Sequence, residues 1–173
     1  MTKTLTLLAA TALLSLGACS KKRPEVLPPA PVGTETETGA PTDPSTVGGA
    51  VVPGSDADFQ RSVSSNTILF GLDQYDSDST ARAILDSQAE WLARYPNVRV
   101  TVEGHADQRG TREYNLGLGD RRANAAKNYL AARGVSPDRM TVISYGKERP
   151  VALGSDESSW AQNRRAVTVV LSR

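Results

Sequence analysis

Residues 100–130 read VTVEGHADQRGTREYNLGLGDRRANAAKNYL, and signals for a strand, a loop and a helix follow one another within them. It begins with valines that alternate with polar residues, as in a strand with one buried face. Residues 104–115 are rich in glycine and charge and predict a loop. Alanine and leucine then recur at three- and four-residue steps, which predicts a helix over about 118–133 that ends at Gly134. The stretch is therefore expected to form a strand, a loop and a helix.

The flanking sequence adds further elements on both sides. Residues 67–70 are a short β-rich run, and a helical pattern over 79–95 is stopped by Pro96. Residues 141–145 and 165–171 read as two more strands separated by a long loop. The order β-α-β-α-β-β predicts an α+β fold, a two-layer sandwich with its helices on one face of a small sheet.

Aromatic residues and proline are segregated along the chain. All nine aromatic residues lie at or after Phe59, whereas seven of the ten prolines fall between Pro24 and Pro53. A segment without aromatic residues cannot bury enough apolar surface to offset the entropy of ordering it. We therefore expect a disordered tether over 19–58 and one domain over 59–173. Two roles remain open for this segment: it either reaches across a gap between the membrane and a binding target, or it is a spacer with no length requirement.

The first 18 residues have the pattern of a secretory signal peptide, with Lys3 followed by an apolar run. This run is shorter than the ~20 residues needed to span a bilayer. The sequence that ends the segment, Leu16-Gly17-Ala18-Cys19, resembles a bacterial lipobox. The resemblance implies that Cys19 is lipidated and becomes the first residue of the mature protein. The alternative to lipidation is that Cys19 keeps a free thiol or forms a disulfide with another molecule. Lipoproteins kept at the inner membrane carry aspartate after the lipidated cysteine, so Ser20 at this position favours an outer-membrane anchor.

Composition and motifs exclude several classes of function. A net charge of +1 and 39% hydrophobic residues give no support to a polybasic nucleic-acid binder or a polytopic membrane protein. The single histidine, His105, has no second ligand at metal-binding spacing, and no nucleophile motif is recognisable. We therefore expect no enzyme and no cofactor, although a two-carboxylate glycosidase that uses Asp107 stays open.

Arginines flank the loop that follows the central strand. Arg109, Arg112, Arg121 and Arg122 surround a segment that also contains Asp107. Arginine is favoured where planar carboxylates or phosphates are bound in bidentate fashion. The pattern indicates an anion-binding loop, and an arginine-rich composition is the alternative explanation.

Four segments together resemble one family. ILFGLDQYD (68–76), the stretch 100–130, VISYGKERP (142–150) and NRRAV (163–167) resemble the OmpA-like peptidoglycan-binding domain. With the lipobox and tether in front, the chain resembles the peptidoglycan-associated lipoproteins of the Tol-Pal system. This resemblance implies non-covalent binding of the meso-diaminopimelate of the cell wall, a role in envelope integrity and division, and the propeller protein TolB as a partner.

The resemblance also assigns a site. Asp107 matches the family's ammonium-binding aspartate, and Arg122 matches its carboxylate-binding arginine. The further residues that the match places around the pocket are Asp73, Leu72, Leu118, Arg109 and Thr111. From the residues alone, Asp73 could be a turn-forming aspartate and Arg122 an exposed helix charge. Gln108 departs from the glutamate that is common in the family, which puts an ion pair to a protein partner in doubt.

Three functions are therefore compared below. The first is a linker between outer membrane and cell wall with a Tol-Pal role. The second is an OmpA-domain lipoprotein that binds the wall without a Tol partner. The third is a membrane-anchored wall hydrolase.

Overall fold

The computed structural model describes residues 46–47 and 50–171. The predicted signal peptide, Cys19 and most of the tether lie outside this part of the chain. The first described elements are two short antiparallel strands, β1 (Thr46–Val47) and β2 (Ala50–Val51). No helix in the described ranges is both long and apolar enough to cross a membrane.

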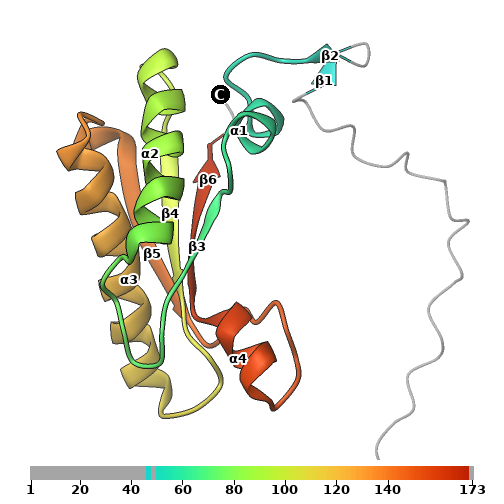
Figure 1. The fold of residues 1–173 in the computed structure, drawn as a ribbon, viewed down its shortest axis with the longest axis vertical. Helices are drawn as coiled ribbons and strands as arrows, with labels where there is room; N and C mark the ends of the chain where they lie inside the picture. Colours follow the sequence, from blue (N-terminus) through green and yellow to red (C-terminus); the bar gives the residue numbers. More distant parts are fainter. Residues whose placement is uncertain (1–45, 48–49, 172–173) are drawn as a thin grey trace, which may run out of the picture. The chain divides into compact units, whose positions relative to one another are not determined.

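The main sheet has four strands in the order β3-β6-β4-β5 (Figure 1). These are β3 (Thr67–Leu69), β4 (Val100–His105), β5 (Met140–Gly146) and β6 (Arg165–Val170). β4 and β5 run parallel because helix α3 crosses between them, whereas β6 pairs antiparallel with both β3 and β4. The last strand of the chain therefore lies between the first and second strands of the domain.

Two long helices, α2 (Ser79–Arg94) and α3 (Arg112–Ala132), cover one face of this sheet (Figure 1). The core between the layers is built from aliphatic side chains of the strands and from Trp91 and Leu92 of α2, which are fully buried. This arrangement confirms the predicted α+β two-layer fold with its helices on one face.

Helix α3 begins at Arg112, earlier than the predicted start near residue 118. Thr111 caps it by accepting a hydrogen bond from the Tyr114 N–H (3.2 Å), so residues 112–117 are helical and not part of the loop. A Cβ atom on Gly104 would lie 1.8 Å from the Gly119 carbonyl oxygen. The two glycines therefore let α3 lie directly on β4, which fixes the helix over the end of that strand.

Two short helices were not predicted. In α1 (Asp56–Ser62), Phe59 packs edge-on against Trp91, and Asp58 accepts a hydrogen bond from Trp91 Nε1 (3.2 Å). Helix α1 thus begins ahead of the predicted domain start at Phe59. Helix α4 (Glu157–Asn163) occupies part of the predicted long loop before β6. A single 3₁₀ turn, η1 (Pro137–Arg139), leads into β5.

Candidate ligand-binding site

A cavity of about 350 Å³ lies where the loops after β3 and β4 meet the first turns of α3. Its lining combines acidic, basic and apolar side chains: Leu72, Asp73, Asp107, Arg109, Gly110, Tyr114, Asn115, Leu118, Arg122 and Arg164. The structure thus brings together every predicted site residue except Thr111. Thr111 lies at the N-terminus of α3, where it caps the helix.

Asp107 follows β4 and is the buried anion of the cavity. Its carboxylate accepts hydrogen bonds from Arg109, through the backbone N–H (3.1 Å), Nε (3.1 Å) and Nη2 (2.6 Å). Burial alone would raise the pKa of Asp107, but the hydrogen bonds from Arg109 outweigh it and hold the pKa below its ordinary value. The side chain is therefore a fixed carboxylate at neutral pH.

Arg122 is fully buried beneath the same cavity. It donates to three backbone carbonyls, those of Gln74 (Nε, 2.8 Å), His105 (Nη1, 2.8 Å) and Gly71 (Nη2, 3.2 Å). Burial, followed by the charge of Arg164, lowers the pKa of Arg122 to about 10, so the guanidinium stays protonated at neutral pH. Arg122 is not an exposed helix charge; it joins the loop after β3 to the end of β4.

Asp73 lies in the loop that Arg122 holds. Its backbone has a φ of 57°, the left-handed region that aspartate tolerates better than most residues, and the Gln74 N–H donates to the Gly71 carbonyl across the turn (3.2 Å). The hydroxyl of Tyr114 donates to the Asp73 carboxylate. Asp73 is therefore a turn residue and also lines the cavity, so the two readings that the sequence left open are compatible.

Arg164 is the main residue of the cavity that the sequence analysis missed. It is buried just before β6 and donates to the Phe70 carbonyl through Nε (3.1 Å), to Glu157 through Nη2 (2.6 Å) and to Asp107 through Nη1 (3.5 Å). Tyr114 and Asn115 were also missed, because the early start of α3 was not predicted. The NRRAV segment is the only signal in the sequence for Arg164; it marks the family resemblance, but the resemblance assigned no role to this arginine.

His105 lies on the far side of β4 from α3, outside the cavity lining. It is buried beside Tyr145, and Glu103 Oε2 lies 3.5 Å from Nε2 without forming a hydrogen bond. Burial, with smaller contributions from the charges of Arg165 and Arg149, lowers the pKa of His105 to about 4. The described residues include no group of three or more metal-ligating side chains.

Comparisons with known proteins place the chain in a family. The OmpA family model matches residues 69–164. The peptidoglycan-associated lipoprotein of Rhizobium meliloti (strain 1021) is 52% identical over 141 residues, which cover 80% of each chain. That of Mesorhizobium japonicum (strain LMG 29417 / CECT 9101 / MAFF 303099) is 40% identical over 98% of this chain and 94% of its own. The chain therefore belongs to the OmpA family, and within it to the peptidoglycan-associated lipoproteins.

Solved structures show the same fold. The crystal structure of the peptidoglycan-associated lipoprotein from Burkholderia pseudomallei has 43% sequence identity and a TM-score of 0.60, and the match covers 61% of this chain and 90% of that one. The C-terminal domain of Helicobacter pylori MotB, at 20% identity and a TM-score of 0.54, matches 61% of this chain and 85% of its own. At that identity the likeness concerns the fold alone.

Proposed function

We propose that this protein is an outer-membrane lipoprotein whose periplasmic domain binds peptidoglycan non-covalently and so links the outer membrane to the cell wall. The observation that carries the proposal is that, in a chain of this family, the buried carboxylate of Asp107 and the buried guanidiniums of Arg122 and Arg164 line the same cavity. We further propose the division into a signal peptide (1–18), a lipidated tether (19–58) that begins at Cys19, and the binding domain (59–173).

The ligand that suits the cavity best is the zwitterionic end of meso-diaminopimelate, which presents an ammonium and a carboxylate on one carbon. Asp107 is proposed to bind the ammonium and Arg122 the carboxylate, since two of the five N–H groups of Arg122 are not used by backbone carbonyls. An unmatched charge in such a pocket is costly, so neutral or singly charged ends are disfavoured. Asp73, Leu72, Leu118 and Arg109 complete the proposed lining, and Thr111 is proposed to contribute from the N-terminus of α3.

Binding is favoured over wall hydrolysis. A glycosidase needs one carboxylic acid with a raised pKa to protonate the leaving group. The hydrogen bonds from Arg109 instead lower the pKa of Asp107, which makes it a poor general acid. Family membership supports the same conclusion, because the relatives are described as peptidoglycan-associated and not as hydrolases.

TolB is proposed as a protein partner, on the strength of family membership, over a surface that overlaps the peptidoglycan site. Gln108 is next to this site, and its amide donates to Ser155 Oγ (2.9 Å) rather than to a charged group. Overlap predicts that TolB and soluble wall fragments exclude one another. A ternary complex in a gel-filtration experiment with both ligands would refute the overlap, and no TolB binding at all would favour the lipoprotein without a Tol partner.

Co-sedimentation with purified sacculi tests wall binding. Wild-type domain should pellet with the sacculi and be released by free meso-diaminopimelate, and no soluble muropeptides should appear. Asp107→Asn, which keeps the side-chain volume and removes the charge, should stay in the supernatant. Pelleting that ignores both the competitor and the substitution would refute the site, and release of muropeptides would support a hydrolase.

A further inference from the structure

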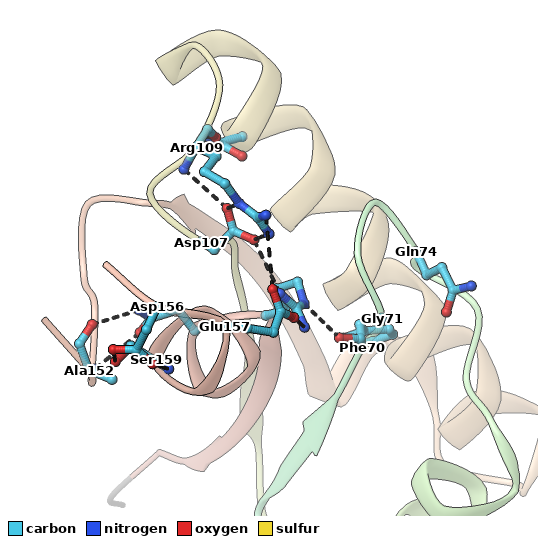
Figure 2. A network of polar contacts seen from close by, with 12 residues as sticks. Phe70, Gly71, Gln74, Asp107, Arg109, Ala152, Asp156, Glu157 and Ser159 are labelled. Atoms are coloured by element: carbon cyan, nitrogen blue, oxygen red, sulfur yellow. Dashed lines mark hydrogen bonds and ion pairs between the residues drawn. The ribbon is translucent and has the colours of Figure 1, made fainter. Parts of the chain in front are cut away.

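Four charged side chains form a ring of alternating sign beside the cavity: Asp107, Arg109, Arg164 and Glu157. Figure 2 shows the polar contacts around three of them, Asp107, Arg109 and Glu157. Asp107 pairs with Arg109 (2.6 Å) and with Arg164 (3.5 Å), and Glu157 of α4 pairs with Arg164 (2.6 Å). Arg109 and Glu157 close the ring at a longer distance of 4.0 Å. Every member of the ring therefore has two neighbours of opposite charge.

The ring consists of a buried pair and an exposed pair. The side chains of Asp107 and Arg164 are only 8% and 7% exposed, whereas those of Arg109 and Glu157 are 36% and 65% exposed. Arg164 is held in place by its bond to the Phe70 carbonyl. Arg109, which also lies over the Trp160 ring at 4.1 Å, and Glu157 both reach solvent, so they are the members that can exchange their partners for the charges of a ligand.

The positions of the exposed pair correspond to the two charges of a zwitterion. Arg109 places a cation on Asp107, as a ligand ammonium would, and Glu157 places a carboxylate on Arg164, as a ligand carboxylate would. Arg164 also has donor capacity toward the cavity, because its Nη1 makes only the 3.5 Å contact with Asp107. Arg122, by contrast, directs three of its N–H groups to backbone carbonyls.

We propose that Arg109 and Glu157 are a built-in substitute for the zwitterionic ligand, and that Arg164 joins Arg122 in binding the ligand carboxylate. On binding, the ligand ammonium takes the place of Arg109 on Asp107, and the ligand carboxylate takes the place of Glu157 on Arg164. The displaced side chains then shorten their own 4.0 Å contact into an ion pair. The exchange leaves no charge unpaired, and the two buried members, Asp107 and Arg164, each keep a partner of opposite charge.

This exchange also discriminates among ligands. A ligand with an ammonium but no neighbouring carboxylate displaces Arg109 alone, and Glu157 must then neutralise both Arg109 and Arg164. Only a ligand with both charges restores full pairing. The inference rests on the proposed function, and it deepens that function by assigning roles to Arg164 and Glu157.

Calorimetric titration with a soluble meso-diaminopimelate muropeptide tests the exchange. Glu157→Gln removes the close pair with Arg164 (2.6 Å) that the ligand must displace, and also the more exposed pair that displaced Arg109 would form with Glu157. Loss of the closer pair dominates, so the Kd should fall about 2- to 5-fold, the scale of one partly exposed ion pair. The matched control is Glu148→Gln. Glu148 is also partly exposed and pairs with Arg112 (3.2 Å) outside the ring, so its substitution should leave the Kd unchanged.

A Glu157→Gln variant that binds no more tightly than Glu148→Gln would overturn the exchange. Failure of the wild-type protein to bind the muropeptide would instead refute the proposed function, so the two failures are distinguishable. Arg164→Lys keeps the charge but loses the planar fork, and should weaken binding at least about 10-fold. Its control is Arg165→Lys, which alters the adjacent arginine whose Nη2 donates to the Arg149 carbonyl. Equal affinities for these two variants would overturn the role of Arg164.

Discussion

Replacing Arg122 by methionine should destabilise the domain as well as impair ligand binding. The substitution removes three hydrogen bonds from a charged group to the carbonyls of Gln74, His105 and Gly71. Such bonds contribute ~1.5–3 kcal/mol each, and the relief of burying a guanidinium offsets part of the loss. The net loss in the free energy of unfolding is therefore about 3 kcal/mol. Methionine keeps an apolar chain of similar length in place of the arginine stem, so the substitution leaves little empty space and adds little to the loss of stability.

Urea unfolding followed by circular dichroism measures this loss, and hydrogen exchange locates it. Amides of residues 71–74 should lose protection beyond the global change, because Arg122 joins this loop to β4. The control is Arg121→Met. The guanidinium of Arg121 lies over the ring of Tyr75 at 5.5 Å, outside the cavity lining, so its loss should change the free energy of unfolding by less than about 0.5 kcal/mol. A stability of Arg122→Met equal to that of Arg121→Met would refute the role of Arg122 in holding the loop.

Three further predictions concern packing, pH and binding. Gly104→Ala should lower the free energy of unfolding by at least about 3 kcal/mol in urea titration, because the new Cβ meets the Gly119 carbonyl. The pKa of His105 is about 4 when folded and 6.5 when unfolded, so the unfolded state binds more protons between these values. The contribution of His105 to the free energy of unfolding should therefore be complete above pH 6.5 and fall by up to about 3 kcal/mol as the pH drops to 4. If the free energy of unfolding of His105→Gln depends on pH as that of the wild-type protein does, this prediction is contradicted. Asp107→Asn should weaken muropeptide binding at least about 10-fold in calorimetry, with cooperative unfolding retained.

The sheet and the two long helices were predictable because their signals are local. Alternating valines mark β4, and regular apolar spacing marks α2. The start of α3 was missed because the glycine and charged residues over 104–115 favour a loop, whereas the structure begins the helix at Arg112, where Thr111 caps it. Helix α4 was missed because it is only seven residues long, and so short a helix depends on tertiary contacts that leave no local pattern in the sequence.

The candidate site was predictable only in part, for a similar reason. The family motif places Asp107 and Arg122, which are close in sequence, on one loop and the helix after it. Arg164 meets Asp107 across 57 positions of the chain, and no local pattern records that contact. The burial of Arg122 could not be predicted from the sequence either, because an arginine on a helix is usually exposed.

Recognition of a zwitterionic end by the cavity is best tested with two ligands that differ in one charge. Calorimetry of the wild-type protein should compare two muropeptides that differ only in the third residue, meso-diaminopimelate or lysine. Lysine keeps the ammonium and lacks the neighbouring carboxylate. The lysine form should bind at least about 10-fold more weakly, because Arg122 and Arg164 gain no anion. Equal affinities for the two muropeptides would contradict recognition of the zwitterionic end.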